Sequence, residues 1–204
     1  IKFDKSYKLL KEWWESQYLT NYEKSYLNKE IISFNQQLFR LKEKKLRIGI
    51  YGKSGVGKSF ILNLLLNKKE FKTDVINGST KKVEGKEWTL NHKSLKTIEL
   101  IDSPGFDSCE IKHPENTFSK INNSELILFA IAGDLNRNEV IQINSFIKNG
   151  KKIILILNKI DIWNEIELKN ILKNIMLKIP QNINIPIIIN SGNNIYRHLV
   201  ETIS

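Results

Sequence analysis

Residues 52–59 have the sequence GKSGVGKS, and this stretch decides the fold. It fits the phosphate-loop pattern G-x-x-x-x-G-K-[ST] at every fixed position. Residues 46–51, LRIGIY, predict a strand before the loop, and residues 60–66, FILNLLL, predict the apolar start of a helix after it. A strand, a glycine-rich turn and a helix are the context in which such a loop cradles phosphate. The stretch therefore predicts an α/β domain with a phosphate site.

The residue types in this loop suit a polyphosphate. Glycines let the main chain approach phosphate oxygens, and the N-terminus of the following helix offers free N–H groups. Lys58 is predicted to reach the β- and γ-phosphates, and the Ser59 hydroxyl to bind Mg²⁺. The alternative is a chance turn rich in glycine, lysine and serine, which the flanking strand and helix disfavour. The predicted nucleotide-binding residues of this region are Gly52, Lys53, Ser54, Gly55, Val56, Gly57, Lys58, Ser59 and Phe60.

A second motif, DSPGF at residues 102–106, follows a predicted strand. Asp102, at the carboxyl end of that strand, is placed to hold the Mg²⁺ shell. The main-chain N–H of Gly105 is predicted to donate to the γ-phosphate, so the segment after it would respond to that phosphate. The alternative is an ordinary Ser-Pro-Gly turn after a strand.

A third motif, NKID at residues 158–161, follows the apolar run IILIL. Asp161 is predicted to accept hydrogen bonds from N1–H and the exocyclic amine of guanine, a donor pair that adenine lacks. Asn158 and Lys159 would brace the loop and cover the base. The pair Asn-Lys also begins at residues 28 and 67, but only the third copy has an Asp two residues later.

From residue 46 onward, strand and helix patterns alternate, which is typical of a mostly parallel sheet between helices. Further strands are expected at 83–90, 95–101, 125–132, 152–157 and 185–190, and helices at 139–148, 165–178 and 193–203. The short turn at 91–94 would make the first two of these strands antiparallel. We therefore expect residues 46–204 to form a three-layer α/β domain, with a mostly parallel six-stranded sheet and one antiparallel edge strand.

Residues 1–45 are predicted to be a helical appendage. Residues 2–45 contain no glycine or proline, and their apolar residues recur at steps of three and four. The pattern predicts either one long helix or a hairpin broken at Thr20-Asn21, with Asn21 as the cap of the second helix. We favour packing of this segment on the main domain; the alternative is a partner-binding or membrane-surface helix anchored by Trp13 and Trp14.

The composition restricts the class of protein only loosely. The formal net charge is +10, from 32 Lys and Arg against 22 Asp and Glu, and the basic residues are densest near the N-terminus. Such a surface could meet RNA, anionic lipid or only water. The single cysteine, Cys109, excludes an internal disulfide framework. There is no secretory signal pattern and no apolar run of about 20 residues, so we expect a cytoplasmic protein without a transmembrane segment, with peripheral membrane contact as an alternative.

In their order and spacing, the three motifs resemble the GTP-binding domain of translation-factor-class GTPases. The match is best to the Era/EngA/septin-like branch, with immunity-related and dynamin-like GTPases as near relatives. The resemblance covers residues 46–204 and implies GTP and GDP as ligands, Mg²⁺ as cofactor and hydrolysis of GTP. It also implies a switch threonine, for which Thr80 matches best and Thr73 is the competitor, and a turn at Ser191 and Gly192 that binds the guanine oxygen.

The resemblance assigns further roles. Segments 69–82 and 103–118 would be the two switches, ordered by the γ-phosphate and loosened after hydrolysis. The implied catalytic residues are Lys58, Thr80 and Gly105, and the implied metal ligands are Ser59, Thr80 and Asp102.

Phe106 departs from the pattern of Ras-like GTPases, which have a glutamine at this position that orients the attacking water. We therefore expect a low intrinsic rate, raised by a partner, by a nucleotide-dependent homodimer or by another loop. Lys53 and Ser54 are candidates for a contribution in cis or in trans. Gly55 replaces an asparagine associated with potassium-dependent catalysis, which disfavours that route. Three cellular roles stay open: a switch that recruits an unknown effector such as RNA or the ribosome, a self-assembling dynamin- or septin-like GTPase at a membrane, and a pseudo-GTPase that only binds.

Overall fold

The structure is a computed structural model that describes residues 3–73, 83–88, 97–107 and 121–190. The chain divides into two compact units. The first combines Ile1–Arg47 with Glu87–Glu99, and the second combines Ile48–Lys86 with Leu100–Ser204. The boundary between an appendage and a main domain at residue 45 stays a prediction.

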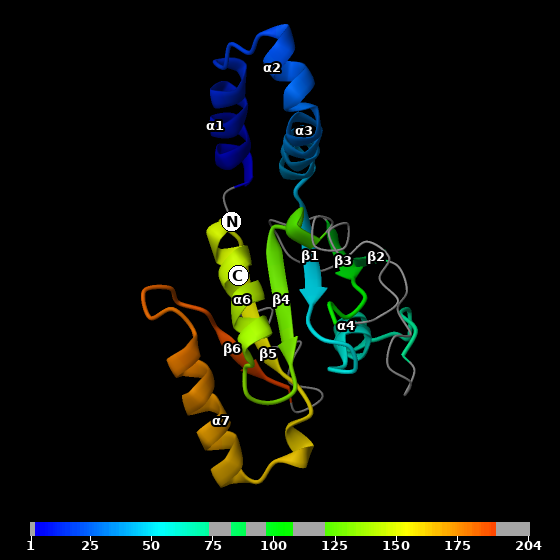
Figure 1. Cartoon of the computed structure of the whole chain (residues 1–204). Coiled ribbons are helices and arrows are strands. Elements are labelled where there is room, and N and C mark those ends of the chain that lie inside the picture. The colour runs from blue at the N-terminus through cyan, green and yellow to red at the C-terminus, as the bar shows by residue number, and fades with distance from the viewer. Residues whose placement is uncertain (1–2, 74–82, 89–96, 108–120, 191–204) are drawn as a thin grey trace. The chain divides into compact units, whose positions relative to one another are not determined.

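The first unit contains three helices, α1 (Phe3–Glu15), α2 (Asn21–Tyr26) and α3 (Asn28–Lys42). Figure 1 shows α1 and α3 running side by side, in agreement with the contacts between them. The ring of Phe34 on α3 lies 4.9 Å from the ring of Trp14 and 5.7 Å from that of Trp13. The helical periodicity of this segment therefore produces a hairpin whose two long helices pack through aromatic side chains.

The cap at the hairpin break is Thr20, and the prediction that Asn21 caps the second helix is wrong. The Thr20 side chain accepts a hydrogen bond from the main-chain N–H of Glu23, and the Glu23 carboxylate accepts one from the Thr20 main chain at 2.8 Å. This reciprocal pair is a capping box. Hydrogen bonds from the Thr20 side chain and main chain lower the pKa of Glu23. The Thr20 hydroxyl, one residue before Asn21, reaches the N–H of Glu23, the third residue of the helix. Asn21 is therefore the first helical residue and not the cap.

The sheet has six strands in the order β2-β3-β1-β4-β5-β6. The pairs β1–β4, β4–β5 and β5–β6 are parallel. The sheet is mostly parallel with one antiparallel strand, which confirms the predicted α/β fold class. The strand bounds are β1 Lys45–Tyr51, β2 Glu84–Trp88, β3 Thr97–Asp102, β4 Leu126–Ile131, β5 Lys152–Leu157 and β6 Ile187–Ile189.

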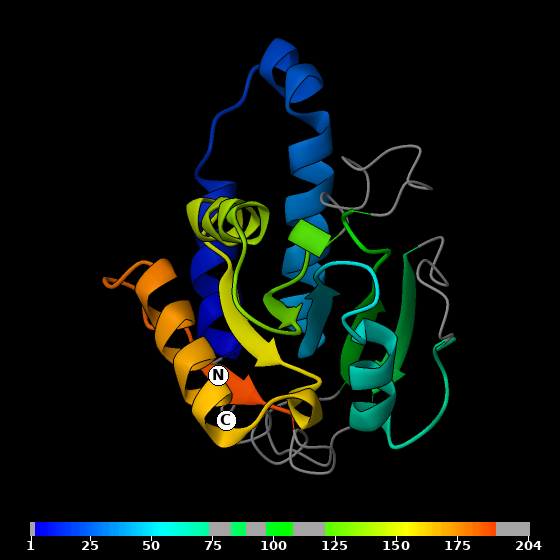
Figure 2. The ribbon, with the colours of Figure 1, turned by 60° about the horizontal axis from the view of Figure 1, so that its bottom comes forward.

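The centre of the sheet is buried on both faces, which explains the continuous apolar runs in β4 and β5. All six residues of β4 are buried. On one face, side chains of β4 and β5 join those of α6 (Arg137–Lys148) and α7 (Glu165–Lys178) in a single core. Figure 2 shows these two helices alongside β5 and β6. A strand that is covered on both sides needs apolar residues at every position, as parallel sheets usually show.

The carboxyl ends of three strands deliver the three sequence motifs to one edge of the sheet. The phosphate loop connects β1 to α4 (Lys58–Leu66), and Asp102 is the last residue of β3. The motif after β5 continues into the short 3-10 helix η1 (Ile160–Ile162). β1 and β5 both run parallel to β4, with Tyr51 opposite Phe129 and Leu157 opposite Ile131, so their carboxyl ends point the same way. Ligands of open α/β sheets bind at this edge.

Two of the predicted elements, the turn at 91–94 and the helix at 193–203, lie outside the described residues. Among the residues that the structure does describe, no helix combines the length and the apolar character needed to cross a bilayer.

Candidate nucleotide-binding site

The phosphate loop closes on the third motif at Gly57. Gly57 is the N-cap of α4 and has a φ of 90°, in the region that favours glycine. A Cβ at this position would collide with the side-chain amide of Asn158. That amide instead donates to the main-chain oxygen of Val56 at 2.8 Å. The loop after β1 and the loop after β5 are therefore in direct contact, and a glycine is needed at the point where they meet.

Lys58 is a buried cation at the start of α4. Its side chain is 7% exposed, and its Nζ donates to the main-chain oxygen of Lys53 at 2.6 Å. Burial lowers the pKa of Lys58 to about 8, while the negative charges of Asp102 and Asp107 act in the opposite direction. A buried ammonium is costly unless an anion compensates it. The position therefore suits a bound phosphate.

Ser59 and Asp102 form a hydroxyl–carboxylate pair. The Ser59 Oγ donates to Asp102 Oδ2 at 2.6 Å, and Asp102 is only 1% exposed. The second carboxylate oxygen accepts from the main-chain N–H of Ser103 at 2.9 Å. Hydroxyl and carboxylate oxygens are ligands that Mg²⁺ accepts, and Mg²⁺ sites usually combine one or two protein oxygens with water and phosphate. The Ser59–Asp102 pair supplies two such protein oxygens. In the described ranges, no cluster of three or more His, Cys, Asp or Glu is arranged to hold a metal ion.

The end of the second motif lies directly on the phosphate loop. A Cβ at Gly105 would collide with the main chain of Ser54. Phe106 stacks on Tyr51 of β1, with ring centroids 5.5 Å apart and an interplanar angle of 16°. The carboxylate of Asp107 accepts a hydrogen bond from the main-chain N–H of Ser54 at 2.6 Å. Phe106 is therefore a packing anchor, and the polar group that faces the loop belongs to the next residue.

The loop after β5 is held by two buried amides. Asn158 is 6% exposed, and its Oδ1 accepts from the side-chain amide of Asn190 at 2.6 Å. Lys159 adopts a left-handed conformation with a φ of 57° and precedes η1. Asp161 lies on η1 and is exposed. The loop thus carries an accessible carboxylate three residues after the buried Asn158, as a base-reading residue requires.

The remaining predicted residues are placed only in part. Asn63 on α4 accepts hydrogen bonds from the main-chain N–H groups of Glu70 and Phe71, at 3.0 and 2.8 Å. The first residues of the predicted switch 69–82 are therefore tied to α4. Thr73 is exposed. Thr80, Ser191 and Gly192 lie outside the described residues.

Two residues of the site were not identified from the sequence. Asp107 falls within the predicted switch 103–118 but was given no role of its own, although a carboxylate two positions after the motif glycine is a visible signal. Asn190 was predicted only as the last residue of the strand at 185–190, directly before the turn at Ser191 and Gly192. Its contact with Asn158 joins residues 32 positions apart, and no local pattern indicates such a pair.

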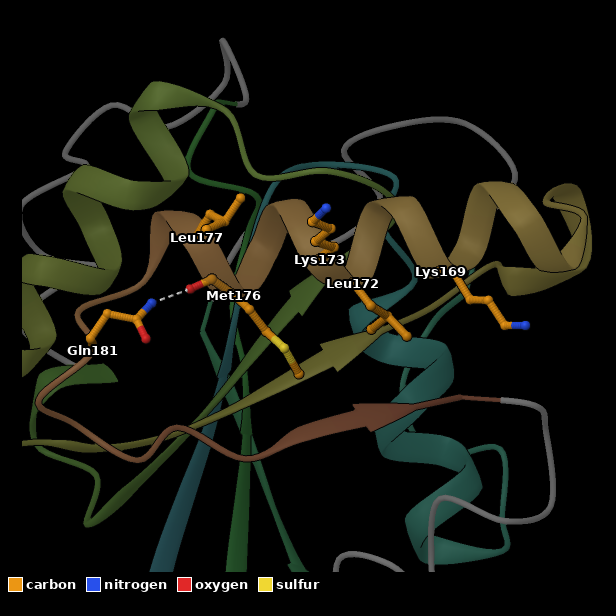
Figure 3. Close-up of a pocket in the computed structure, with 6 residues that line it drawn as sticks. All are labelled: Lys169, Leu172, Lys173, Met176, Leu177 and Gln181. Carbon is orange, nitrogen blue, oxygen red and sulfur yellow. Dashed lines mark hydrogen bonds between the residues drawn. The ribbon is translucent and has the colours of Figure 1, made fainter.

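A hollow on α7 is separate from these residues. Figure 3 shows side chains of α7 and the turn after it around this hollow, with the Gln181 amide donating to the Met176 main-chain oxygen at 2.7 Å. None of the predicted site residues lines it. Its lining residues are Lys169, Leu172, Lys173, Met176, Leu177 and Gln181.

Fold and site together define a P-loop nucleotide-binding domain. The family model described as 50S ribosome-binding GTPase matches residues 47–159. The chain belongs to this family. The match contains the first two motifs and the first two residues of the third, Asn158 and Lys159, and it confirms the resemblance to the Era/EngA branch of the translation-factor-class GTPases.

Two relatives illustrate the similarity at the sequence level. The tRNA modification GTPase MnmE of Mycoplasma genitalium is 29% identical over 138 residues, which cover 66% of this chain and 30% of that protein. The GTPase Der of Buchnera aphidicola subsp. Schizaphis graminum is 30% identical over 177 residues, which cover 80% of this chain and 37% of that protein. The chain thus spans about a third of the length of these curated relatives.

Solved structures show the same domain. A structure of Era in complex with MgGDPNP and a segment of 16S ribosomal RNA is 26% identical, with a TM-score of 0.65, and the match covers 78% of this chain and 55% of that one. Era of Aquifex aeolicus bound to GDP·AlF4⁻ has a TM-score of 0.64 at 23% identity, over 78% of this chain and 56% of that one. The second likeness concerns the fold alone.

Proposed function

We propose that the chain binds GTP and GDP together with Mg²⁺ and hydrolyses GTP slowly, as a conformational switch. The observation that carries this proposal is the convergence of Lys58, the Ser59–Asp102 pair and Asn158 at one edge of the sheet. These groups come from three different motifs. The residues that make the contacts are those expected to bind phosphate, Mg²⁺ and the base. The relatives named above, which are GTPases, support the same activity.

Each group has a role in this proposal. Lys58 and the loop N–H groups hold the β- and γ-phosphates and stabilise the charge that develops between them. Ser59 and Asp102 hold Mg²⁺, which supplies further positive charge at the phosphates when it is bound. Asp161 accepts hydrogen bonds from guanine, and Ser191 and Gly192 approach its oxygen. Thr80, or Thr73 in its place, completes the metal and γ-phosphate contacts.

RNA or the ribosome is the partner that we propose first. The family description refers to the 50S ribosome, the Era neighbour was solved with 16S ribosomal RNA, and the net charge of +10 favours contact with a polyanion. Nucleotide-dependent dimerisation is the alternative. Residue 106 is a phenylalanine that packs on Tyr51 and cannot orient water as a glutamine would, so a second copy of the chain could supply the missing group. A cytoplasmic location follows from the first choice, and peripheral contact with a membrane stays compatible with the second.

The experiment is GTP turnover per molecule over a hundredfold range of protein concentration, with ATP in parallel. A low rate that is independent of concentration and specific for GTP supports a switch that awaits an external activator. A specific activity that rises with concentration supports the dimer. Equal use of ATP would contradict the role of Asp161, and an absence of both binding and turnover would contradict the proposal as a whole.

A further inference from the structure

The carboxylate of Asp107 occupies a position on the phosphate loop that no motif assigns. From its contacts we infer that the Asp107 carboxylate acts as a substitute for phosphate in the nucleotide-free protein. It accepts a hydrogen bond from a main-chain N–H of the phosphate loop, and it must move away before a γ-phosphate binds. It would thereby make the site prefer GDP to GTP. This inference rests on the proposed function, since it concerns the selectivity of the same site.

The geometry places Asp107 on the γ-phosphate side of the loop. Its Oδ1 accepts from the main-chain N–H of Ser54 at 2.6 Å. Gly105, which the second motif assigns to the γ-phosphate, lies so close to Ser54 that a Cβ would collide with it. The main-chain N–H of Phe106 also approaches the main-chain oxygen of Gly52, at 3.4 Å. Three consecutive residues therefore rest on the first turn of the loop, where the terminal phosphate has to enter.

The packing of Phe106 explains why the carboxylate is held in this place. Its ring stacks on Tyr51, and Tyr51 is in turn packed against Phe129 and Phe146, with centroid distances of 5.8 and 5.1 Å. Tyr51 is 3% exposed, so it belongs to the rigid core. An aromatic anchor of this kind fixes the chain on one side of Asp107 and limits the positions that the carboxylate can reach.

Electrostatics supply the selectivity. Asp107 acts on the buried Lys58 as a compensating negative charge, the part that a phosphate also plays. A carboxylate and a γ-phosphate compete for the same donors, and their like charges repel each other at short range. GDP lacks the third phosphate and leaves the Ser54 N–H to Asp107. Binding of GTP therefore costs the contact between Asp107 and Ser54, whereas binding of GDP does not.

The test compares the dissociation constants of GDP and of the non-hydrolysable analogue Gpp(NH)p, by titration calorimetry with Mg²⁺ present. The chain is compared with Asp107→Asn, which removes the charge, and Asp107→Ala, which also removes the hydrogen bond. Asp134→Asn is the matched control, because Asp134 pairs with Lys178 at 2.6 Å and neither residue belongs to the site. Asp107 is exposed, so its replacement should leave folding intact, which circular dichroism checks.

We expect the preference for GDP over Gpp(NH)p to fall about tenfold in Asp107→Asn, and at least as far in Asp107→Ala. The Asp134→Asn control should keep the original ratio within about twofold. A second readout needs no nucleotide: hydrogen exchange at the Ser54 amide should become several-fold faster in Asp107→Ala, because its acceptor is gone.

Each alternative outcome decides against the inference. An unchanged ratio in both variants, with normal binding of both nucleotides, would overturn the role of Asp107 and leave the proposed function standing. A loss of turnover without a change in the ratio would make Asp107 part of the hydrolytic machinery and would likewise overturn it. If the unaltered chain bound neither nucleotide, the proposed function would fail as well.

Discussion

The loop after β1 and the loop after β5 meet at the same edge of the sheet, but they are organised differently. In the phosphate loop, the groups that would face a ligand are already in contact with protein atoms, since Lys58 bonds to Lys53, Ser59 to Asp102, and Ser54 to Asp107. In the loop after β5, the buried amide of Asn158 is held by hydrogen bonds to Val56 and Asn190, whereas Asp161 is exposed.

The difference reflects the two kinds of ligand group. Phosphates are charged, so the cations and donors that bind them are expensive to bury without a substitute, and the protein supplies internal anions and carbonyls. A guanine base is neutral, and the carboxylate that would bind it stays hydrated when no base is present, so it carries little desolvation cost. We therefore expect changes in the phosphate loop to alter both affinity and stability, and changes at Asp161 to alter selectivity alone.

The largest effect is expected for Lys58→Ala. This substitution removes the buried ammonium at the start of α4. Since charge-assisted contacts to phosphate are strong, we expect the affinity for GDP and Gpp(NH)p to fall by about a thousandfold. Fluorescence titration with a labelled nucleotide measures this. Lys148→Ala, an exposed lysine near the end of α6, should bind as before. A loss of less than about tenfold would show that the loop N–H groups carry the affinity.

Lys58 should also make the stability of the nucleotide-free protein depend on pH. Its pKa is about 8 when folded, against 10.5 for an ordinary lysine. Between these values the unfolded chain holds the proton that the folded chain has released, so stability rises with pH, by about 3 kcal/mol in total. Urea unfolding in magnesium-free buffer, from pH 7 to above pH 10, measures the free energy of unfolding.

Lys58→Met is the control for this pH dependence. It keeps a long side chain without a titratable group, so the stability difference between the two proteins should shrink across the window. Parallel pH curves for both proteins would show that the buried lysine keeps its charge when no ligand is bound.

Asp161→Ala should change which base is accepted. Removing the carboxylate leaves the guanine donors without their partner, so the preference for GTP over ATP should fall by about a hundredfold, while the free energy of unfolding stays the same within error. Competition titrations give the selectivity. Glu165→Ala, an exposed acidic residue in the first turn of α7, is the control. If stability fell together with selectivity, the contrast between the two loops would be wrong.

The smallest effect is expected for Asn190→Ala. It removes the amide that donates to Asn158, and a buried acceptor without its donor costs about 1–2 kcal/mol. We expect that loss in the free energy of unfolding, together with a few-fold weaker binding of GDP, because Asn158 also braces the phosphate loop through Val56. Asn174→Ala, exposed on α7, should be nearly neutral. An effect on GDP binding without one on stability would place Asn190 in the base site itself.

Much of the fold could be predicted because its signals are local. Strand β5 and helix α7 have the predicted bounds. The ends of a run of β-branched residues and of a capped amphipathic segment are visible in the local sequence. The cap at Thr20 was missed because Thr20 and Asn21 are both good capping residues, and only the geometry of the third N–H distinguishes them.

The sequence by itself determined which residue types stand at the candidate site, and from them the chemistry that we propose. Lysine, serine and aspartate at fixed spacings after predicted strands indicate phosphate, Mg²⁺ and guanine, because these residue types carry the donors and acceptors in question. Only the tertiary structure decided which of these groups form hydrogen bonds to other protein groups when no ligand is bound. The contacts of Asp107 with Ser54 and of Asn190 with Asn158 span 53 and 32 positions. They depend on the register of the sheet and on the packing of Phe106 against Tyr51, which no local pattern contains.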